Sequence, residues 1–230
     1  MSRHYWVLAF AFFGCSSNSK SPEPPAGGCV SNAGMVCATE LQAFPFVKFA
    51  AAGTDFCLGG PGSTCYSSVP PDGASTRKMS QTSPGSLCLS GKVAAGGFAL
   101  LALVLADKSD DGRKILHAFD AAARGITQVT LTIDSPPSQG ATLLAHSVVK
   151  TSCPSGPQDC FFPPDFKFND ISQASTVTAP LNAFVSADDA TMSLDAGAIN
   201  DILVRVGPGD YDFCVHDFAL LDAQGEPVTP

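Results

Sequence analysis

Tryptophan and tyrosine are scarce in this sequence, although phenylalanine is not. Trp occurs once, at residue 6, and Tyr occurs three times, at residues 5, 66 and 211. Aromatic rings offer a broad apolar face with a polar edge, and that face is what stacks on a flat ligand. Their scarcity argues against a binding surface built from exposed Trp or Tyr side chains.

The usual signatures of catalysis are also missing. The sequence has no Gly-x-Ser-x-Gly, His-Glu-x-x-His or Cys-x-x-Cys motif and no glycine-rich phosphate loop before a helix. We therefore assign no catalytic residue and expect no enzyme. His216 and Asp217 are consecutive, and consecutive residues of a regular strand point to opposite faces, so we do not expect a His–Asp dyad there. His146 shares a predicted strand face with Leu144 and Val148, which favours a packed or hydrogen-bonded histidine.

Basic residues are few. The chain has 13 Lys and Arg against 21 Asp and Glu, a formal net charge of −8. Without residues 1–14, which hold Arg3 and no acidic residue, the charge is −9. A protein of this charge is repelled by polyanions, so we expect no nucleic-acid partner.

The first fifteen residues have the pattern of an export signal. A short basic start with Arg3 precedes the apolar run 7–13, which is followed by Gly14 and Cys15. Seven apolar residues are too few to span a bilayer. The end resembles the lipobox of bacterial lipoproteins, in which a small residue precedes a cysteine that becomes lipidated, although the two residues before Gly14 are phenylalanines. The resemblance implies lipidation of Cys15; the alternative is an ordinary signal peptide cut nearby.

Residues 15–28 then form the lipidated cysteine and a tether. Residues 16–28 read SSNSKSPEPPAGG, with Ser, Gly and Pro and no aliphatic side chain larger than Ala. Such a segment is flexible and extended. We therefore expect an exported protein anchored to the cell envelope through lipid. By resemblance to Gram-negative lipoproteins, Ser16 implies transit to the outer membrane.

Setting Cys15 aside leaves an even number of cysteines, which suits disulfides in an exported protein. The neighbouring cysteine pairs 29/37, 57/65 and 153/160 could each close a short loop, and Cys88 would then pair with Cys214. The connectivity stays open, because eight cysteines allow 105 pairings. The eight disulfide candidates are Cys29, Cys37, Cys57, Cys65, Cys88, Cys153, Cys160 and Cys214.

The rest of the chain predicts an all-β protein. Residues 29–85 are rich in Cys, Gly and Pro, and we expect a lead-in that packs on the main domain or contributes strands to it. Residues 86–226 hold short alternating or apolar segments separated by turns, which is typical of a β-sandwich. Within these regions we expect a loop at 72–84, strands at 87–93, 98–106, 127–134 and 142–149, and a hairpin in which 211–221 folds back on 202–206.

Several segments of the region 86–225 resemble galactose-binding-like jelly-roll domains, which occur in carbohydrate-binding modules and in exported lipoproteins. The similar segments are His117–Asp120, Arg124–Ile126, Val129–Leu131, the loop with Cys153 and Cys160, and Ile199–Ile202 with Tyr211–Leu221. The resemblance implies a jelly-roll β-sandwich that binds carbohydrate. It departs from the family at the Trp expected on a middle strand, where residues 181–185 read LNAFV.

Two candidate sites follow. Tyr211 comes after a turn and could expose its ring beside Asp210 and Asp212 as a ligand site, although packing of Tyr211 at the hairpin end is favoured. Asp107, Ser109 and Asp111 place oxygen side chains at alternate positions before Gly112, as at the start of a calcium loop, although an acidic solvated turn is favoured. Apart from such a structural calcium, we expect no cofactor.

The sequence thus predicts a non-catalytic, surface-tethered lipoprotein that binds an extracellular ligand, such as a carbohydrate, through loops at one end of the sandwich. Two alternatives remain open. One is a structural or interaction protein of the envelope with no small-molecule site. The other is an exported hydrolase, which would need two carboxylates converging in a cleft.

Overall fold

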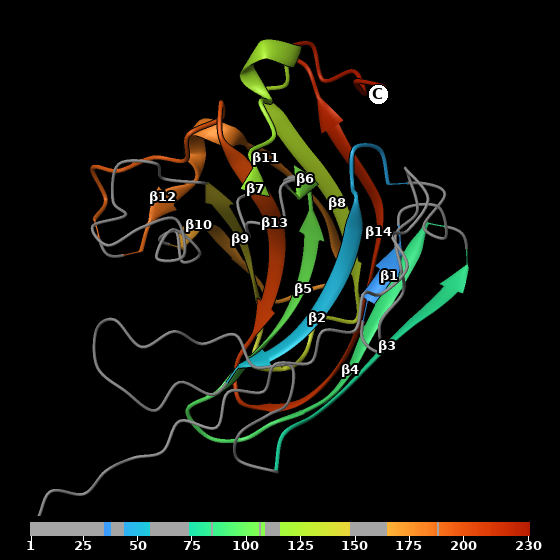
Figure 1. Ribbon diagram of the computed structural model, residues 1–230. Helices are drawn as coiled ribbons and strands as arrows, with labels where there is room; N and C mark the ends of the chain where they lie inside the picture. Colours follow the sequence, from blue (N-terminus) through green and yellow to red (C-terminus); the bar gives the residue numbers. More distant parts are fainter. Residues whose placement is uncertain are drawn as a thin grey trace, which may run out of the picture.

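The protein is built from two antiparallel sheets packed face to face (Figure 1). A computed structural model describes residues 35–37, 44–55, 74–83, 85–105, 107–108, 116–147, 165–187 and 189–230. The seven-stranded sheet has the order β1-β2-β5-β13-β9-β10-β12, and the five-stranded sheet has the order β11-β8-β14-β4-β3. The strands β6 and β7 pair with each other. The predicted all-β sandwich is confirmed.

The strands are short, as the spacing of turn residues predicted. Their bounds are β1 Met35–Cys37, β2 Phe49–Asp55, β3 Thr76–Ser83, β4 Ser86–Val93, β5 Phe98–Val104, β6 Asp107–Lys108, β7 Leu116–His117, β8 Gln128–Asp134, β9 Ala141–Ser147, β10 Phe166–Ile171, β11 Ser175–Pro180, β12 Val185–Ser186, β13 Ile199–Val206 and β14 Gly209–Leu221. Among the described residues, the helical segments are two 3-10 turns, η1 Ala122–Arg124 and η3 Leu181–Ala183. No described helix is long and apolar enough to cross a membrane.

The core lies between the sheets because alternate residues of each strand point inward. On β8 the inward residues Val129, Leu131 and Ile133 are fully buried, while the threonines between them lie on the outer face. The strand β14 supplies Phe213 and Phe218 to the same core. The strands predicted at 87–93, 98–106, 127–134 and 142–149 are confirmed as β4, β5, β8 and β9 within a residue or two at most ends.

The predicted hairpin between residues 202–206 and 211–221 is wrong. The strand β13 pairs with β5 and β9, whereas β14 pairs with β4 and β8 in the other sheet. The turn at 207–208 therefore carries the chain across the core from one sheet to the other. Each of the two strands has an apolar face that packs in the core. This face is buried whether the two strands pair in one sheet or lie in opposite sheets.

The region 29–85 contributes strands to both sheets, which is one of the two possibilities that the sequence left open. The strand β2 lies between β1 and β5, and β3 is the edge strand beside β4. The loop predicted at 72–84 is wrong, because most of it is β3. An edge strand can be polar because backbone hydrogen bonds to its single neighbour hold it in the sheet and little of its side-chain surface is buried. Among the described side chains of β3, only Met79 packs against the core.

A disulfide joins Cys88 of β4 to Cys214 of β14, two residues that lie directly opposite each other in the five-stranded sheet. This pairing confirms the one long link considered from the sequence. Since 126 positions separate the two cysteines, the loop-entropy model assigns the bridge about 5 kcal/mol. The side chains of the other candidate cysteines, and all of Cys15, the signal and the tether, lie outside the described residues.

Candidate functional site

A groove opens at the end of the sandwich where η1 and the chain's C-terminus lie, at the top of Figure 1. Its volume is about 590 Å³, within the range of small-ligand sites. The groove lies between the two 3-10 turns and the start of β8. Its lining residues are Ala122, Gly125, Ile126, Thr127, Gln128, Pro180, Leu181, Asn182, Ala196 and Ala223.

Local sequence explains how the two turns frame the groove. The carboxylate of Asp120 accepts a hydrogen bond from the backbone N–H of Ala123, which holds the start of η1. Gly125, with φ 71°, ends that turn in the left-handed region that glycine tolerates. The turn η3 is anchored by a hydrogen bond from the backbone N–H of Leu181 to the carbonyl of Thr127, 2.8 Å long. The walls of the groove are therefore tied to β8.

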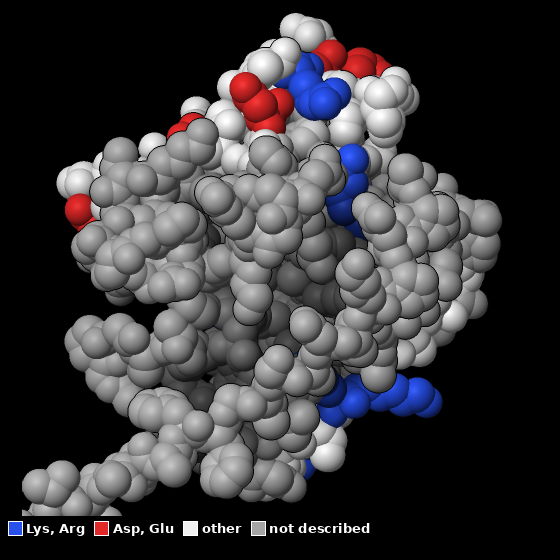
Figure 2. All heavy atoms as spheres, in the orientation of Figure 1, with Lys and Arg blue, Asp and Glu red and all other residues white. Residues whose placement is uncertain are grey.

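The chemistry of the groove is neutral. No Asp, Glu, Lys or Arg is among its lining residues, and its polar groups are the Thr127 hydroxyl and the amides of Gln128 and Asn182. The Gln128 amide donates a hydrogen bond to the backbone carbonyl of Asp222. The exposed side chains of Asn182 and Thr127 are therefore the polar groups of the lining that a ligand can most readily contact. Figure 2 shows acidic and basic side chains at the same end of the molecule, outside this lining.

An aromatic clamp lies beside the groove and was not recognised in the sequence. The guanidinium of Arg124 lies 5.3 Å from the ring centre of Phe46 and 5.4 Å from that of Phe119. Cation–π contacts of this kind stabilise exposed arginines. The clamp directs Arg124 to the loop before β2 and fixes η1 against it. The aromatic-proline run around Pro45 signalled an irregular segment, but not its contact with Arg124.

The ligand residues predicted around the β13–β14 turn do not meet the groove. Tyr211 is 3% exposed, and its hydroxyl donates a 2.8 Å hydrogen bond to the carbonyl of Thr76. Its ring is therefore not available for stacking, and the packing alternative is the one observed. Asp210 and Asp212 are exposed, but they lie at the start of β14, whereas the groove lies beyond its end.

The predicted calcium site cannot be placed. Asp107 lies in β6, while Ser109 and Asp111 fall outside the described residues. Among the residues that are described, no group of three or more His, Cys, Asp and Glu side chains is positioned to hold a metal ion.

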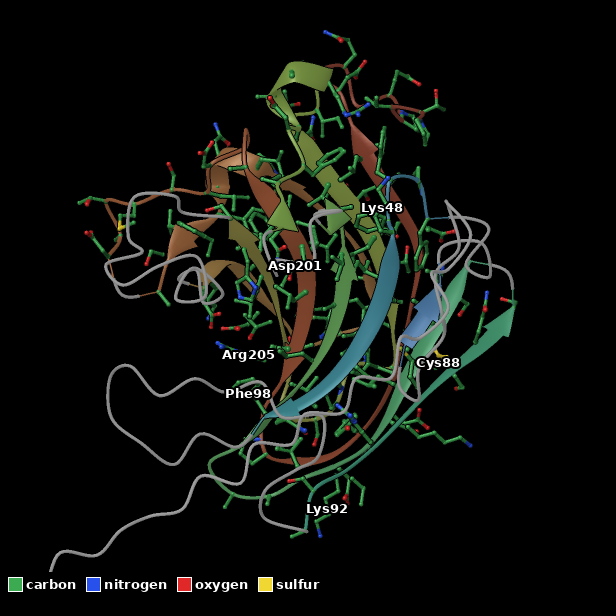
Figure 3. The ribbon with its side chains drawn as sticks, viewed as in Figure 1. Lys48, Cys88, Lys92, Phe98, Asp201 and Arg205 are labelled. Atoms are coloured by element: carbon green, nitrogen blue, oxygen red, sulfur yellow. A yellow bond between two sulfur atoms is a disulfide. The ribbon has the colours of Figure 1, made fainter. Side chains whose placement is uncertain are left out.

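A charged network lies on the outer face of the seven-stranded sheet. His146 of β9 is 5% exposed, and its Nε2 lies 3.0 Å from the carboxylate of Asp165. Its Nδ1 lies 2.9 Å from the carboxylate of Asp201 on β13. Arg205, farther along β13, pairs with Asp165 and stacks on Phe98 (Figure 3). The prediction of a buried, hydrogen-bonded His146 is confirmed, although it lies outside the main core.

Burial and charge act in opposite directions on the pKa values of this network. Burial alone would lower the pKa of His146, but the nearby carboxylates of Asp201 and Asp165 outweigh it and raise the pKa to about 10. Burial alone would raise the pKa of Asp165, but His146 and Arg205 outweigh it and hold that pKa below its ordinary value. The network is thus a set of paired charges in which His146 and Asp201 are buried, while Asp165 and Arg205 reach solvent.

A second histidine network lies on the outer face of the five-stranded sheet, and it corrects an expectation. The His216 ring contacts Asp217 through Nδ1 at 2.7 Å and Asp134 through Nε2 at 2.9 Å. Adjacent residues can meet because a bulge interrupts the β8–β14 register after His216, and Asp217 has φ 54°. The rule that consecutive side chains diverge fails at this bulge.

Comparison with known proteins returned no matching family model and no similar curated protein. Among solved structures, a family 11 carbohydrate-binding module of the cellulosomal cellulase Lic26A-Cel5E of Clostridium thermocellum has 14% identity and a TM-score of 0.48, covering 84% of this chain and 97% of that one. A family 30 carbohydrate-binding module of the C. thermocellum cellulase Cel9D-Cel44B has 11% identity and a TM-score of 0.43, covering 75% and 94%. Both TM-scores lie below 0.5, so the fold assignment rests on the strand order of this chain.

Proposed function

We propose that this protein is a non-catalytic binding module, tethered to the cell envelope by lipid on Cys15, whose end groove takes a neutral carbohydrate. The observation that carries the proposal is the composition of the groove: an apolar floor, an amide and hydroxyl rim, and no charged lining residue. A sugar ring presents apolar C–H faces and neutral hydroxyl groups, and these match the two parts of the lining.

The floor and the rim have separate roles in this proposal. Pro180, Ala122 and Ala223 supply exposed apolar surface against which a C–H face packs, above the buried Ile126 and Leu181. Asn182 and Thr127 supply donors and acceptors for hydroxyl groups. No aromatic side chain lines the groove, so each sugar unit gains less contact than on a stacked ring, and we expect weak binding of a short oligosaccharide.

The absence of a charged lining residue bears on the hydrolase alternative. Glycoside hydrolysis uses a pair of carboxylates that flank the bond to be cleaved. The lining of this groove includes no Asp or Glu. A binding role therefore accounts for the groove better than a hydrolytic one.

A glycan array tests the binding proposal on the chain from residue 16 onward. We expect binding to neutral oligosaccharides and none to sulfated or uronic-acid ones. Ala223→Leu fills the groove from an exposed lining position without adding a stacking ring and should weaken binding at least tenfold. Ser138→Leu, at an exposed turn away from the lining, is the matched control and should bind as the parent does. An array without any neutral ligand would refute the proposal.

The tether is tested separately by the mass of the mature N-terminus. We expect an acylated cysteine at position 15 in the membrane fraction and an unacylated form after Cys15→Ser. A Cys15→Ser protein that still carries lipid would contradict the proposed anchor. Fractionation of the two membranes then tests the proposed transfer to the outer membrane.

A further inference from the structure

The polar cluster on the outer face of the seven-stranded sheet is built around a bulge in β13. Ile199 pairs with Ser147 of β9 and Asp201 pairs with His146, so Asn200 is an extra residue in the register. A bulge of this kind redirects the side chains beside it. Here it brings Asn200 and Asp201 together next to His146.

Three polar atoms of this cluster lack a hydrogen-bond partner in the part of the chain that the structure describes. They are Nδ1 of His146, Oδ1 of Asp201 and Oδ1 of Asn200. The first two lie 2.9 Å apart but do not have the alignment of a hydrogen bond. Both side chains are 95% buried, and buried polar atoms rarely stay unsatisfied. These unsatisfied atoms leave the cluster open to a further polar group or ion.

The remaining polar atoms of the cluster are already held in place. Nε2 of His146 lies 3.0 Å from a carboxylate oxygen of Asp165, whose other oxygen pairs with Arg205. The Asn200 amide nitrogen donates a 2.7 Å hydrogen bond to Oδ2 of Asp201. When a histidine donates one ring N–H to a carboxylate, a metal ion can bind its other nitrogen by displacing the proton there.

We propose that His146 Nδ1, Asp201 Oδ1 and Asn200 Oδ1 form a site for a divalent transition-metal ion such as Zn²⁺. Nδ1 and Oδ1 lie 2.9 Å apart, whereas two ligands bound at about 2.1 Å and at the tetrahedral angle of zinc lie about 3.4 Å apart, so Zn²⁺ binding would separate the two atoms by about half an ångström. Imidazole with carboxylate oxygen suits zinc, nickel or cobalt, whereas calcium prefers oxygen ligands alone.

The ligand set explains the whole cluster. Asp165 orients the imidazole, Arg205 offsets the charge of Asp165, and Asp201 offsets part of the charge of the ion. Asp165 is one-third exposed and contacts Nε2, so solvent reaches the side of the imidazole away from the proposed ion. The ion would join the neighbouring strands β9 and β13. The competing arrangement is an imidazolium paired with Asp201 and no ion.

Metal binding to the full oxidised chain tests the proposal. We expect one Zn²⁺ per chain by calorimetry and elemental analysis, a visible absorption band with Co²⁺, and no competition from Ca²⁺. Asp201→Asn and His146→Gln should each weaken Zn²⁺ binding at least tenfold. The matched control is His216→Gln, which removes the other His–Asp network and should leave the affinity unchanged.

Nitrogen-15 spectra of the wild-type histidines provide a readout that needs no variant. Zn²⁺ should move the Nδ1 resonance of His146 to the range of a metal-bound nitrogen while Nε2 stays protonated. The proposal is overturned by a chain that takes up no Zn²⁺, or by a His146 ring that keeps both N–H protons at saturating Zn²⁺. Uptake that survives both Asp201→Asn and His146→Gln, or is lost equally in His216→Gln, also overturns it.

Discussion

Two histidines of this protein each lie between two aspartates, one on the outer face of each sheet, and their surroundings differ. His146 contacts Asp165 and Asp201 and is 5% exposed. The His216 side chain is 29% exposed, and its partners Asp134 and Asp217 are more exposed still. The same kinds of groups are therefore buried in one sheet and hydrated in the other.

The two outer faces are also stabilised by different interactions. The seven-stranded sheet carries a small apolar cluster of Leu100, Leu144 and Leu203 beside the His146 network. The five-stranded sheet carries the Cys88–Cys214 disulfide and threonine pairs across β8 and β11. The outer face of the seven-stranded sheet thus combines buried charges with apolar packing. The outer face of the five-stranded sheet is stabilised by a disulfide and by exposed polar contacts.

The largest expected effect comes from the covalent link. Replacing both Cys88 and Cys214 with Ser should lower the free energy of unfolding by up to about 5 kcal/mol, because the bridge constrains a long loop of the unfolded chain. Denaturant unfolding of the oxidised protein measures the change. A loss below about 1 kcal/mol would show that the five-stranded sheet does not depend on its disulfide.

The second effect tests whether the His146 network is held by burial. His146→Leu leaves Asp201 buried without its partner and should cost about 3 kcal/mol in the free energy of unfolding. The double variant His146→Leu/Asp201→Leu should lose less free energy of unfolding than His146→Leu or Asp201→Leu alone, because two leucines extend the apolar cluster of Leu144 and Leu203. Urea denaturation without added metal measures all three. Additive costs in the double variant would contradict this account.

The sequence predicted the strands in which the order of apolar and polar side chains follows their burial. Strict alternation identified β8, and the run of apolar residues identified β5 as an interior strand. The polar strand β3 was missed because an edge strand is held by backbone hydrogen bonds, which leave no pattern in the side chains. The hairpin was predicted wrongly because a turn at residues 207–210 is equally compatible with pairing in one sheet and with crossing to the other.

The candidate sites were less predictable because they depend on register. The face shared by His146 and Leu144 indicated burial, but Asp201 comes from β13 and Asp165 from the residue before β10. The position of Asp217 depends on a bulge set by pairing with β8, and only the tolerance of Asp for positive φ signals it. The groove is formed by turns that follow β7 and β11, so its neutral lining follows from tertiary structure alone.

The smallest expected effect concerns the exposed network, and it depends on pH. Burial alone would lower the pKa of His216, but its hydrogen bonds with Asp217 and Asp134 and their charges together outweigh this and raise the pKa above 6.5. The folded protein therefore holds this proton more tightly than the unfolded chain does. The stabilisation is complete below about pH 6.5 and is lost as pH rises through the folded-state pKa. Removing it by His216→Gln should cost at most about 1 kcal/mol at pH 6, because exposed ion pairs are weak.

The measurement is the difference in the free energy of unfolding between wild type and His216→Gln from pH 5 to pH 9. Taking this difference cancels the titration of His146, whose surroundings are the same in both proteins. The difference should shrink as pH rises, and 1 M NaCl should reduce it at pH 6 because salt screens exposed charges. A difference that stays constant with pH, or that equals the cost of His146→Leu, would show that exposure does not separate the two histidine networks.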